Sequence, residues 1–173
     1  MYVDIYGHTD STGNDGINIP LSNKRAQSVE AYLKSCGVSA SQLQKVVGKG
    51  SSEPVAATAT VQGRKENRRV EVYLYASQAM IDAAIGGAVG AGAGAIIGHH
   101  MDKVAEQAKQ VENAKVEKVT DANGLEAVKV TFDSGILFAT NKADLSAASK
   151  TALANFSKTL KENNLLYVDI YGH

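Results

Sequence analysis

An identical seven-residue segment, YVDIYGH, begins at Tyr2 and occurs again at residues 167–173. In both copies the apolar Val and Ile alternate with Tyr and Asp, which is the pattern of a β-strand that buries one face. Because one position in a sheet accepts only one strand, the other copy must be disordered, lie at a sheet edge or complete the sheet of a second molecule. The repeat therefore constrains the fold more than any other feature of the sequence.

The first copy leads into a polar loop and then a helix. Gly7 ends the strand, and residues 8–16 contain Thr, Asp, Ser and Asn between glycines, a composition that favours turns. Pro20 predicts the first turn of a helix, and apolar residues at helical spacing extend it to Gly37. The pattern indicates a binding loop, with Arg25 about one turn into the helix, where the helix N-terminus would favour an anion.

Further strands and helices follow in alternation. Strands are predicted from short apolar or alternating segments at residues 43–47, 69–76, 116–119, 125–132 and 165–172. Asn123-Gly124 predicts the turn of a hairpin. Residues 63–67 predict a polar turn or short helix, and apolar residues from Leu145 to Leu160 predict a helix capped near Asp144 or Ser146.

Residues 83–98 carry no charge and place glycine at every fourth position, at Gly86, Gly90, Gly94 and Gly98. On a helix these glycines would form one stripe, a spacing that lets helices pack closely in a membrane. The apolar run is shorter than the roughly twenty residues needed to span a bilayer. Membrane contact through this segment, a flexible linker and a helix packed on a partner all remain open.

Composition excludes several classes of function. Eighteen basic residues balance eighteen acidic ones among 173 residues, so no overall charge favours nucleic acid as a partner. The single cysteine, Cys36, cannot form an internal disulfide, and its place near a helix end favours a packed thiol. Strand-like residues follow Met1 at once, so no export signal is expected in this chain.

Three motifs occur in one order along the chain. They are Gly7-His-Thr-Asp10, Asn18-x-x-Leu-Ser-x-x-Arg25-Ala26 and Gly63-Arg-x-x-Asn67-Arg-Arg69-Val-Glu71. Together they resemble the OmpA-like C-terminal domain, the peptidoglycan-binding module of outer-membrane proteins, peptidoglycan-associated lipoproteins and flagellar stators. Two later segments resemble that family's first strand and the loop after it: Val130-Thr-Phe132-Asp133-Ser-Gly-Ile-Leu-Phe138 and Asn141-Lys-x-x-Leu145.

The resemblance implies an α+β fold, in which a βαβαβ arrangement packs a small mixed sheet against helices. The two later segments come first in the family, so the chain resembles a circularly permuted domain. The expected parts are a C-terminal portion of the domain at 1–77, a glycine-zipper segment of the outer-membrane lipoprotein type with a connecting helix at 78–114, and the N-terminal portion of the same domain at 115–173. An engineered permutant and a fragment of two tandem domains both fit this order.

The resemblance also implies a ligand, the meso-diaminopimelate of the peptidoglycan stem peptide. Its end presents a carboxylate beside an ammonium group. Asp10 and Arg25, fifteen residues apart, match the family's ligand-binding Asp and Arg, and such a pair can bind both groups. An ion pair between Asp10 and Arg25 that only ties the loop to the helix is the alternative.

Other ligand contacts carry over from the family with less weight. Asn18 and Arg68 match its further polar partners. Weaker candidates are Thr9 and the backbone near Phe132 and Asp133. A buried charged ligand end needs such donors and acceptors, because an unpaired buried charge costs several kcal/mol.

The implied function is non-covalent binding of peptidoglycan, which tethers the outer membrane to the cell wall from the periplasm. No catalytic residue, cofactor or metal site is expected, since His8 and Asp10 lack a nucleophile with a base and an orienting partner. His99 and His100 point apart on a helix and lack a further ligand at useful spacing. The alternative function is an engineered or strand-swapping assembly module, in which the repeated segment drives homo-oligomerisation.

Overall fold

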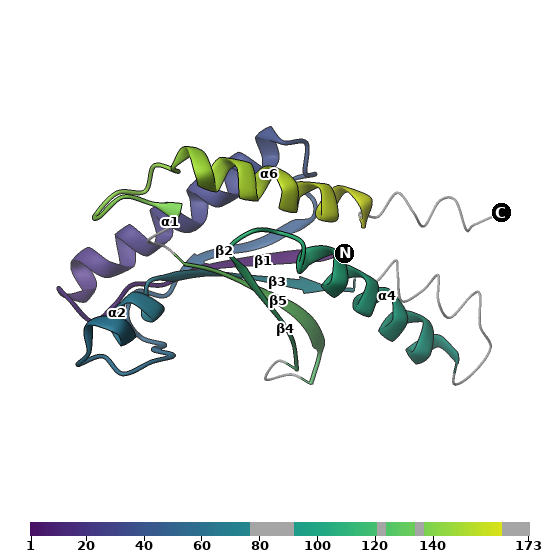
Figure 1. Cartoon of the computed structure of the whole chain (residues 1–173), viewed down its shortest axis with the longest axis horizontal. Coiled ribbons are helices and arrows are strands. Elements are labelled where there is room, and N and C mark those ends of the chain that lie inside the picture. The colour runs from purple at the N-terminus through teal and green to yellow at the C-terminus, as the bar shows by residue number, and fades with distance from the viewer. Residues whose placement is uncertain (77–91, 121–123, 134–136, 164–173) are drawn as a thin grey trace.

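The computed structural model describes residues 1–76, 92–120, 124–133 and 137–163, with the backbone alone for 92–96. Its strands are β1 (Tyr2–Gly7), β2 (Leu43–Gly48), β3 (Arg69–Tyr75), β4 (Ala114–Thr120) and β5 (Glu126–Asp133). Its helices are α1 (Asp15–Ser35), α2 (Val61–Asn67), α4 (Gly92–Ala108) and α6 (Ala147–Glu162). The strands form one mixed sheet in the order β2-β1-β3-β5-β4, so the predicted α+β fold is confirmed (Figure 1).

Strand β1 occupies an inner position in this sheet. It pairs with β2 in parallel and with β3 antiparallel, and β5 then joins β3 and β4 antiparallel. Segments from both halves of the chain therefore build the same sheet. The first YVDIYGH copy forms β1 and is paired with a neighbouring strand on each of its two edges. The second copy, at 167–173, lies outside the described residues.

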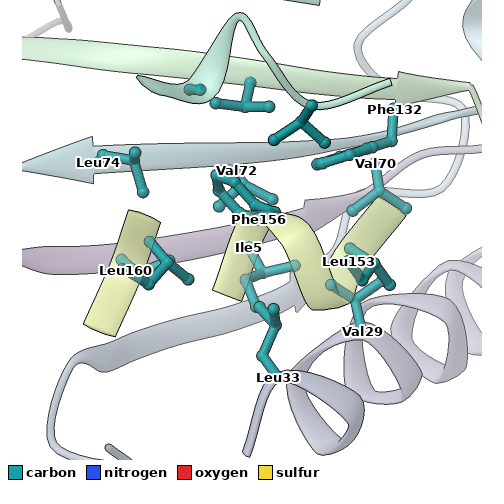
Figure 2. Packing of buried hydrophobic residues seen from close by; sticks show 14 of the residues in the cluster. Ile5, Val29, Leu33, Val70, Val72, Leu74, Phe132, Leu153, Phe156 and Leu160 are labelled. Atoms are coloured by element: carbon teal, nitrogen blue, oxygen red, sulfur yellow. The ribbon is translucent and has the colours of Figure 1, made fainter. Parts of the chain in front are cut away.

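The core lies between the sheet and the helices α1 and α6, which lie on the same face of the sheet (Figure 1). Val3 and Ile5 of β1 point into it, as the strand alternation predicts, and Ile5 lies near Val29 and Leu33 of α1 (Figure 2). Phe156 of α6 fills the space below β3 and β5 (Figure 2). Burial of each such side chain contributes about 1.5–3 kcal/mol, so this layer stabilises most of the fold.

Helix α1 begins five residues before the predicted start at Pro20. The side chain of Asn14 caps it by accepting a hydrogen bond from the Ile17 backbone at 3.2 Å, and Asp15 adds a negative charge in the first turn. Pro20 therefore lies inside the helix. The expectation that Arg25 sits near the helix N-terminus is wrong, because Arg25 lies nearly three turns into α1.

The later elements agree with their predictions. Strands β4 and β5 form the expected hairpin, with Gly124 at a φ of 79°, and residues 121–123 lie outside the described part. Ser146 caps α6 by accepting a hydrogen bond from the Ser149 backbone at 3.2 Å. These capping and turn residues act locally, which is why sequence alone predicts them.

The glycine-rich segment is described only in part. Residues 92–98 belong to α4, which continues into the predicted connecting helix and ends at Ala108, while 83–91 lie outside the described residues. Asn113, at a φ of 62°, marks the turn into β4. Among the helices that can be described, none is both long and apolar enough to cross a membrane.

Polar contacts connect α6 to the end of α1 and to the segment before β2. Lys161 of α6 donates a hydrogen bond to the carbonyl of Cys36 at 2.9 Å, and the half-buried Cys36 ends α1. The buried Gln42 side chain donates to the Leu160 carbonyl at 3.1 Å. These bonds join segments more than a hundred residues apart in sequence, so the two halves of the chain pack as one unit.

Candidate ligand-binding site

The candidate site lies where β1 ends and the polar loop begins. Two glycines let α1 approach the sheet there, since a Cβ at Gly7 would lie 2.2 Å from the Ser22 carbonyl oxygen and one at Gly48 would lie 2.3 Å from the Asn23 backbone nitrogen. The Thr9 backbone N–H then donates to the Gly50 carbonyl at 2.8 Å. The loop is thus held between α1 and the segment after β2.

Asp10 is an ionised, partly buried carboxylate. Its Oδ2 lies 2.5 Å from Nη1 of Arg68, and its Oδ1 accepts a hydrogen bond from the Thr12 backbone at 2.8 Å. Burial acts to raise the pKa of Asp10, but the hydrogen bonds from Arg68 and Thr12 outweigh it and lower the pKa below its usual range. The side chain therefore carries its negative charge at neutral pH.

Arg25 is a buried cation with unused donors. It is 4% exposed, its Nε donates to the Lys142 carbonyl at 3.1 Å, and its guanidinium lies 5.3 Å from the centre of the Phe138 ring. Neither terminal nitrogen makes a hydrogen bond or ion pair with a residue that the structure describes. Because an unpaired buried charge is costly, this geometry favours an anion as the missing partner.

The charges around Arg25 act in opposite directions. Burial lowers the pKa of Arg25, the nearby Arg68 lowers it further, and Asp10 raises it. The guanidinium still stays protonated, because an arginine pKa remains far above neutral. Asp10, Arg25 and Arg68 therefore form one electrostatic unit.

The alternative ion pair between Asp10 and Arg25 is wrong. Both residues are described, yet the ion pair of Asp10 is with Arg68, which joins the loop to the start of β3. The sequence placed Arg68 among the polar partners of a ligand but did not indicate this pairing. Arg25 is left with its terminal nitrogens free of the carboxylate that the spacing suggested.

Asn18 and Thr9 lie beside this unit. The side chain of Asn18 is 4% exposed and donates to the Asp10 carbonyl at 3.4 Å. The Oγ1 of Thr9 is buried without a hydrogen-bond partner among the described atoms. Both side chains therefore add polar groups to the same region as Asp10.

The weaker candidate near the end of β5, the backbone near Phe132 and Asp133, stays a prediction, because the loop at 134–136 lies outside the described residues. The Phe132 ring itself packs against Phe156 in the core, with centroids 5.6 Å apart. The structure adds two contacts that the sequence reasoning missed, the carbonyl of Lys142 and the ring of Phe138. In the sequence, only the two motifs that contain Phe138 and Lys142 indicated this region, because no local pattern connects either residue with Arg25.

A network of buried charged and polar side chains lies next to the site. Arg69, which belongs to the third motif, donates to Glu71 at 2.7 Å and to the Glu53 carbonyl at 3.0 Å. Glu71 lies 3.6 Å from Nε2 of the buried His8. Burial acts to raise the pKa of Glu71, but the His8 and Arg69 contacts dominate and hold the pKa well below its usual range.

Asn67 fixes the loop that follows β2. Its side-chain oxygen accepts from the backbones of Val55 and Ala56 at 2.8 and 3.0 Å, and its amide donates to the Ala56 carbonyl at 3.0 Å. Asn67 directly precedes Arg68 in the chain. The Asn-Arg-Arg motif therefore orders the loop, pairs Asp10 and anchors β3 with three consecutive side chains.

Residues 1–68 match the sequence model of the OmpA family, and this match contains Thr9, Asp10, Asn18, Arg25 and Arg68. The chain is 51% identical over 70 residues to the peptidoglycan-binding protein ArfA of Mycobacterium tuberculosis H37Rv. It is 46% identical over 70 residues to the outer-membrane lipoprotein YfiB of Pseudomonas aeruginosa and 43% identical over 72 residues to the probable lipoprotein YiaD of Escherichia coli K12.

These similarities cover a minor share of every chain involved. They include 40% of this chain for ArfA and YfiB and 42% for YiaD. They include 21% of ArfA, 41% of YfiB and 32% of YiaD. The chain thus spans less than half the length of the curated relatives that it matches.

Proposed function

We propose that this protein, whose residues 1–68 match the OmpA family, binds peptidoglycan non-covalently through Asp10, Arg25 and Arg68. The observation that carries the proposal is the buried Arg25, whose terminal nitrogens lack a partner in the described part of the chain, beside the ionised Asp10. The name of the relative ArfA states peptidoglycan binding, which supports this function. The protein is not an enzyme, since OmpA-family peptidoglycan-binding proteins are non-enzymatic.

The finer proposal is that the ligand group is the zwitterionic end of meso-diaminopimelate. The terminal nitrogens of Arg25 would hold its carboxylate in two parallel hydrogen bonds, the strongest geometry for this pair. Asp10, with Arg68 on one oxygen, would accept from its ammonium. The unpartnered hydroxyl of Thr9 and the Asn18 amide would complete the polar surroundings.

We further propose that the two halves of the chain are one permuted domain. Strand β5 pairs with β3 along its length, and α6 lies beside α1 on the same face of the sheet, which supports a single unit (Figure 1). The name of YfiB, an outer-membrane lipoprotein, supports a place at the outer membrane, from which binding to peptidoglycan would tether that membrane to the cell wall.

Sedimentation with purified peptidoglycan sacculi tests the proposed site. Asp10→Ala and Arg25→Ala should each remove the bound fraction, and free meso-diaminopimelate should compete with the unaltered protein. Lys24→Ala is the matched control, because Lys24 is an exposed cation next to Arg25 on α1. Undiminished binding by both site variants would rule the site out.

A second candidate function is assembly by strand exchange. Its support is that β1 already lies between β2 and β3 and is paired with both. The position between these strands is therefore not available in the same sheet for the identical segment at 167–173. The mass in solution, measured with and without residues 167–173, tests it. An oligomer that becomes a monomer on truncation supports exchange, and an unchanged folded monomer removes it.

A further inference from the structure

The face of the sheet that points away from α1 and α6 is hollowed into a groove of about 810 Å³. Strands β1, β3 and β5 form its floor, and Lys45 of β2 and Met101 of α4 lie at its sides. Its volume is in the range of pockets that bind small organic molecules. None of the residues proposed to bind the stem peptide lines it, so it is a separate surface.

Tyrosine rings dominate the floor. Tyr6 and Tyr73 meet edge to face with centroids 5.6 Å apart, and Tyr73 stacks beside Tyr75 at 6.3 Å with the rings 14° from parallel. Strand alternation puts these rings on the face opposite the core, and each is only half-buried. The floor therefore offers a row of rigid aromatic surface with polar tips.

Two buried carboxylates lie among the rings. Asp4 is 6% exposed, accepts from the Tyr6 hydroxyl at 3.3 Å and lies 4.0 Å from the ammonium of Lys45. Glu71 is 4% exposed and accepts from the Tyr73 hydroxyl at 2.9 Å. Burial is the main influence on Asp4 and raises its pKa, which reflects how weakly Lys45 compensates its charge.

Lysines form ion pairs with acidic side chains that line the groove. Lys129 lies 3.3 Å from Glu71, and Lys49 lies 3.2 Å from Glu53 at the edge of the groove. The same lysines lie over the tyrosine rings, Lys49 at 5.3 Å from the Tyr6 centroid and Lys129 at 6.0 Å from that of Tyr73. An external cation would compete with both lysines, and an apolar partner would bury paired charges at a cost.

We propose that this groove binds a carbohydrate chain, the glycan strand of peptidoglycan. Tyrosine rings can stack on the apolar faces of sugar rings, and paired carboxylates and ammonium groups supply acceptors and donors for hydroxyls without requiring a charged ligand. The carbohydrate class follows from the groove alone. The glycan strand as its source rests on the proposed function.

The position of the groove relative to the stem-peptide site agrees with this assignment. Lys49 and Glu53 line the groove, and between them the Gly50 carbonyl accepts the backbone N–H of Thr9, next to Asp10. One loop therefore separates the two surfaces. A polymer whose peptides branch from a sugar backbone could occupy both at once.

NMR titration of the whole chain with peptide-free glycan strands, prepared by amidase digestion, tests the proposal. The amide signals of Asp4, Tyr6 and Tyr73 should shift, while that of Arg25 stays unchanged. Tyr75→Ser should weaken this binding about tenfold, and Tyr32→Ser, a tyrosine on α1 away from the groove, should leave it unchanged. Thermal unfolding of each variant checks that the fold is retained.

Three results would overturn it. No shift with any sugar would remove the groove as a carbohydrate site, as would shifts confined to residues outside it. Equal binding of malto-oligosaccharides would retain the carbohydrate class but overturn the glycan strand as its source. The Asp10→Ala and Arg25→Ala sedimentation results are independent of these outcomes, because peptide-free strands lack the diaminopimelate that the stem-peptide site is proposed to bind.

Discussion

Arg68, not Arg25, forms the ion pair with Asp10, although fifty-eight positions separate them in the chain. The pair joins the loop after β1 to the start of β3 and holds the Asp10 carboxylate in one orientation. Arg25 is thereby left free to bind an anion. Under the proposed function, Arg68 would position the loop and Arg25 would contact the ligand.

Arg68→Ala should weaken peptidoglycan binding by roughly tenfold, whereas Arg25→Ala should abolish it, because the charged end of Arg68 is already engaged by Asp10 within the protein. The pH dependence should change too. A depressed Asp10 pKa maintains binding above that pKa and loses it as the pH falls through it, so removal of Arg68 should move the loss to higher pH. Sedimentation between about pH 2 and pH 7 measures both effects, and identical profiles would contradict the positioning role.

Arg25→Lys should lose about tenfold or more in affinity although the charge is kept. Lysine has no planar fork for two parallel hydrogen bonds and cannot reproduce both the bond to the Lys142 carbonyl and the contact with the Phe138 ring. Titration calorimetry with a soluble stem peptide measures the loss. Lys24→Arg, the reverse exchange on the exposed neighbouring position, should change nothing.

Gly7→Ala should lower the free energy of unfolding by about 1–3 kcal/mol, since the new Cβ would lie 2.2 Å from the Ser22 carbonyl oxygen and α1 would have to move. Gly98→Ala is the control. That glycine lies in α4, where an added Cβ would meet no described atom within 4 Å, so alanine should be neutral or stabilise the helix by up to about 1 kcal/mol. Urea unfolding of both variants provides the comparison, and equal effects would contradict the close approach.

Glu71→Gln should destabilise the fold by about 3 kcal/mol near pH 7, because it leaves Arg69 and Lys129 without their carboxylate in a buried place. The pKa of Glu71 is lowered in the folded protein, so its contribution is complete above the unfolded pKa of roughly 4.3 and declines as the pH falls below it. The variant should therefore lose less stability on acidification than the unaltered protein. Denaturation at pH 7 and pH 3 tests this, with the exposed Glu112→Gln as the control.

Local sequence signals predicted most of the fold. Alternation in β1 assigned Val3 and Ile5 to the buried face, because strand side chains point to alternate sides whatever lies around them. A cap near Asp144 or Ser146 was predicted for the same reason, since a capping bond spans three residues, and the structure shows Ser146 in that role.

The errors occurred where two signals overlapped or where a contact was distant. Asn14 lies in a polar, glycine-rich loop whose composition also favours turns, so the sequence does not single out Asn14 as a helix cap and favours Pro20 as the start. The contacts of Arg25 with Lys142 and Phe138 cross more than a hundred positions. Nothing in the spacing of a single motif encodes such a contact, and the same holds for the pairing of Asp10 with Arg68.

If the protein binds the cell wall as proposed, the inner position of β1 also affects how a pull on that wall would reach the fold. Asp10 follows the end of this strand, and β1 is held on one edge by β2 and on the other by β3. Tension applied at Asp10 along the strand loads both ladders of hydrogen bonds in shear, so many bonds resist together instead of opening one after another. A strand at the sheet edge would present only one ladder to the same load, and the tether would yield at a lower force.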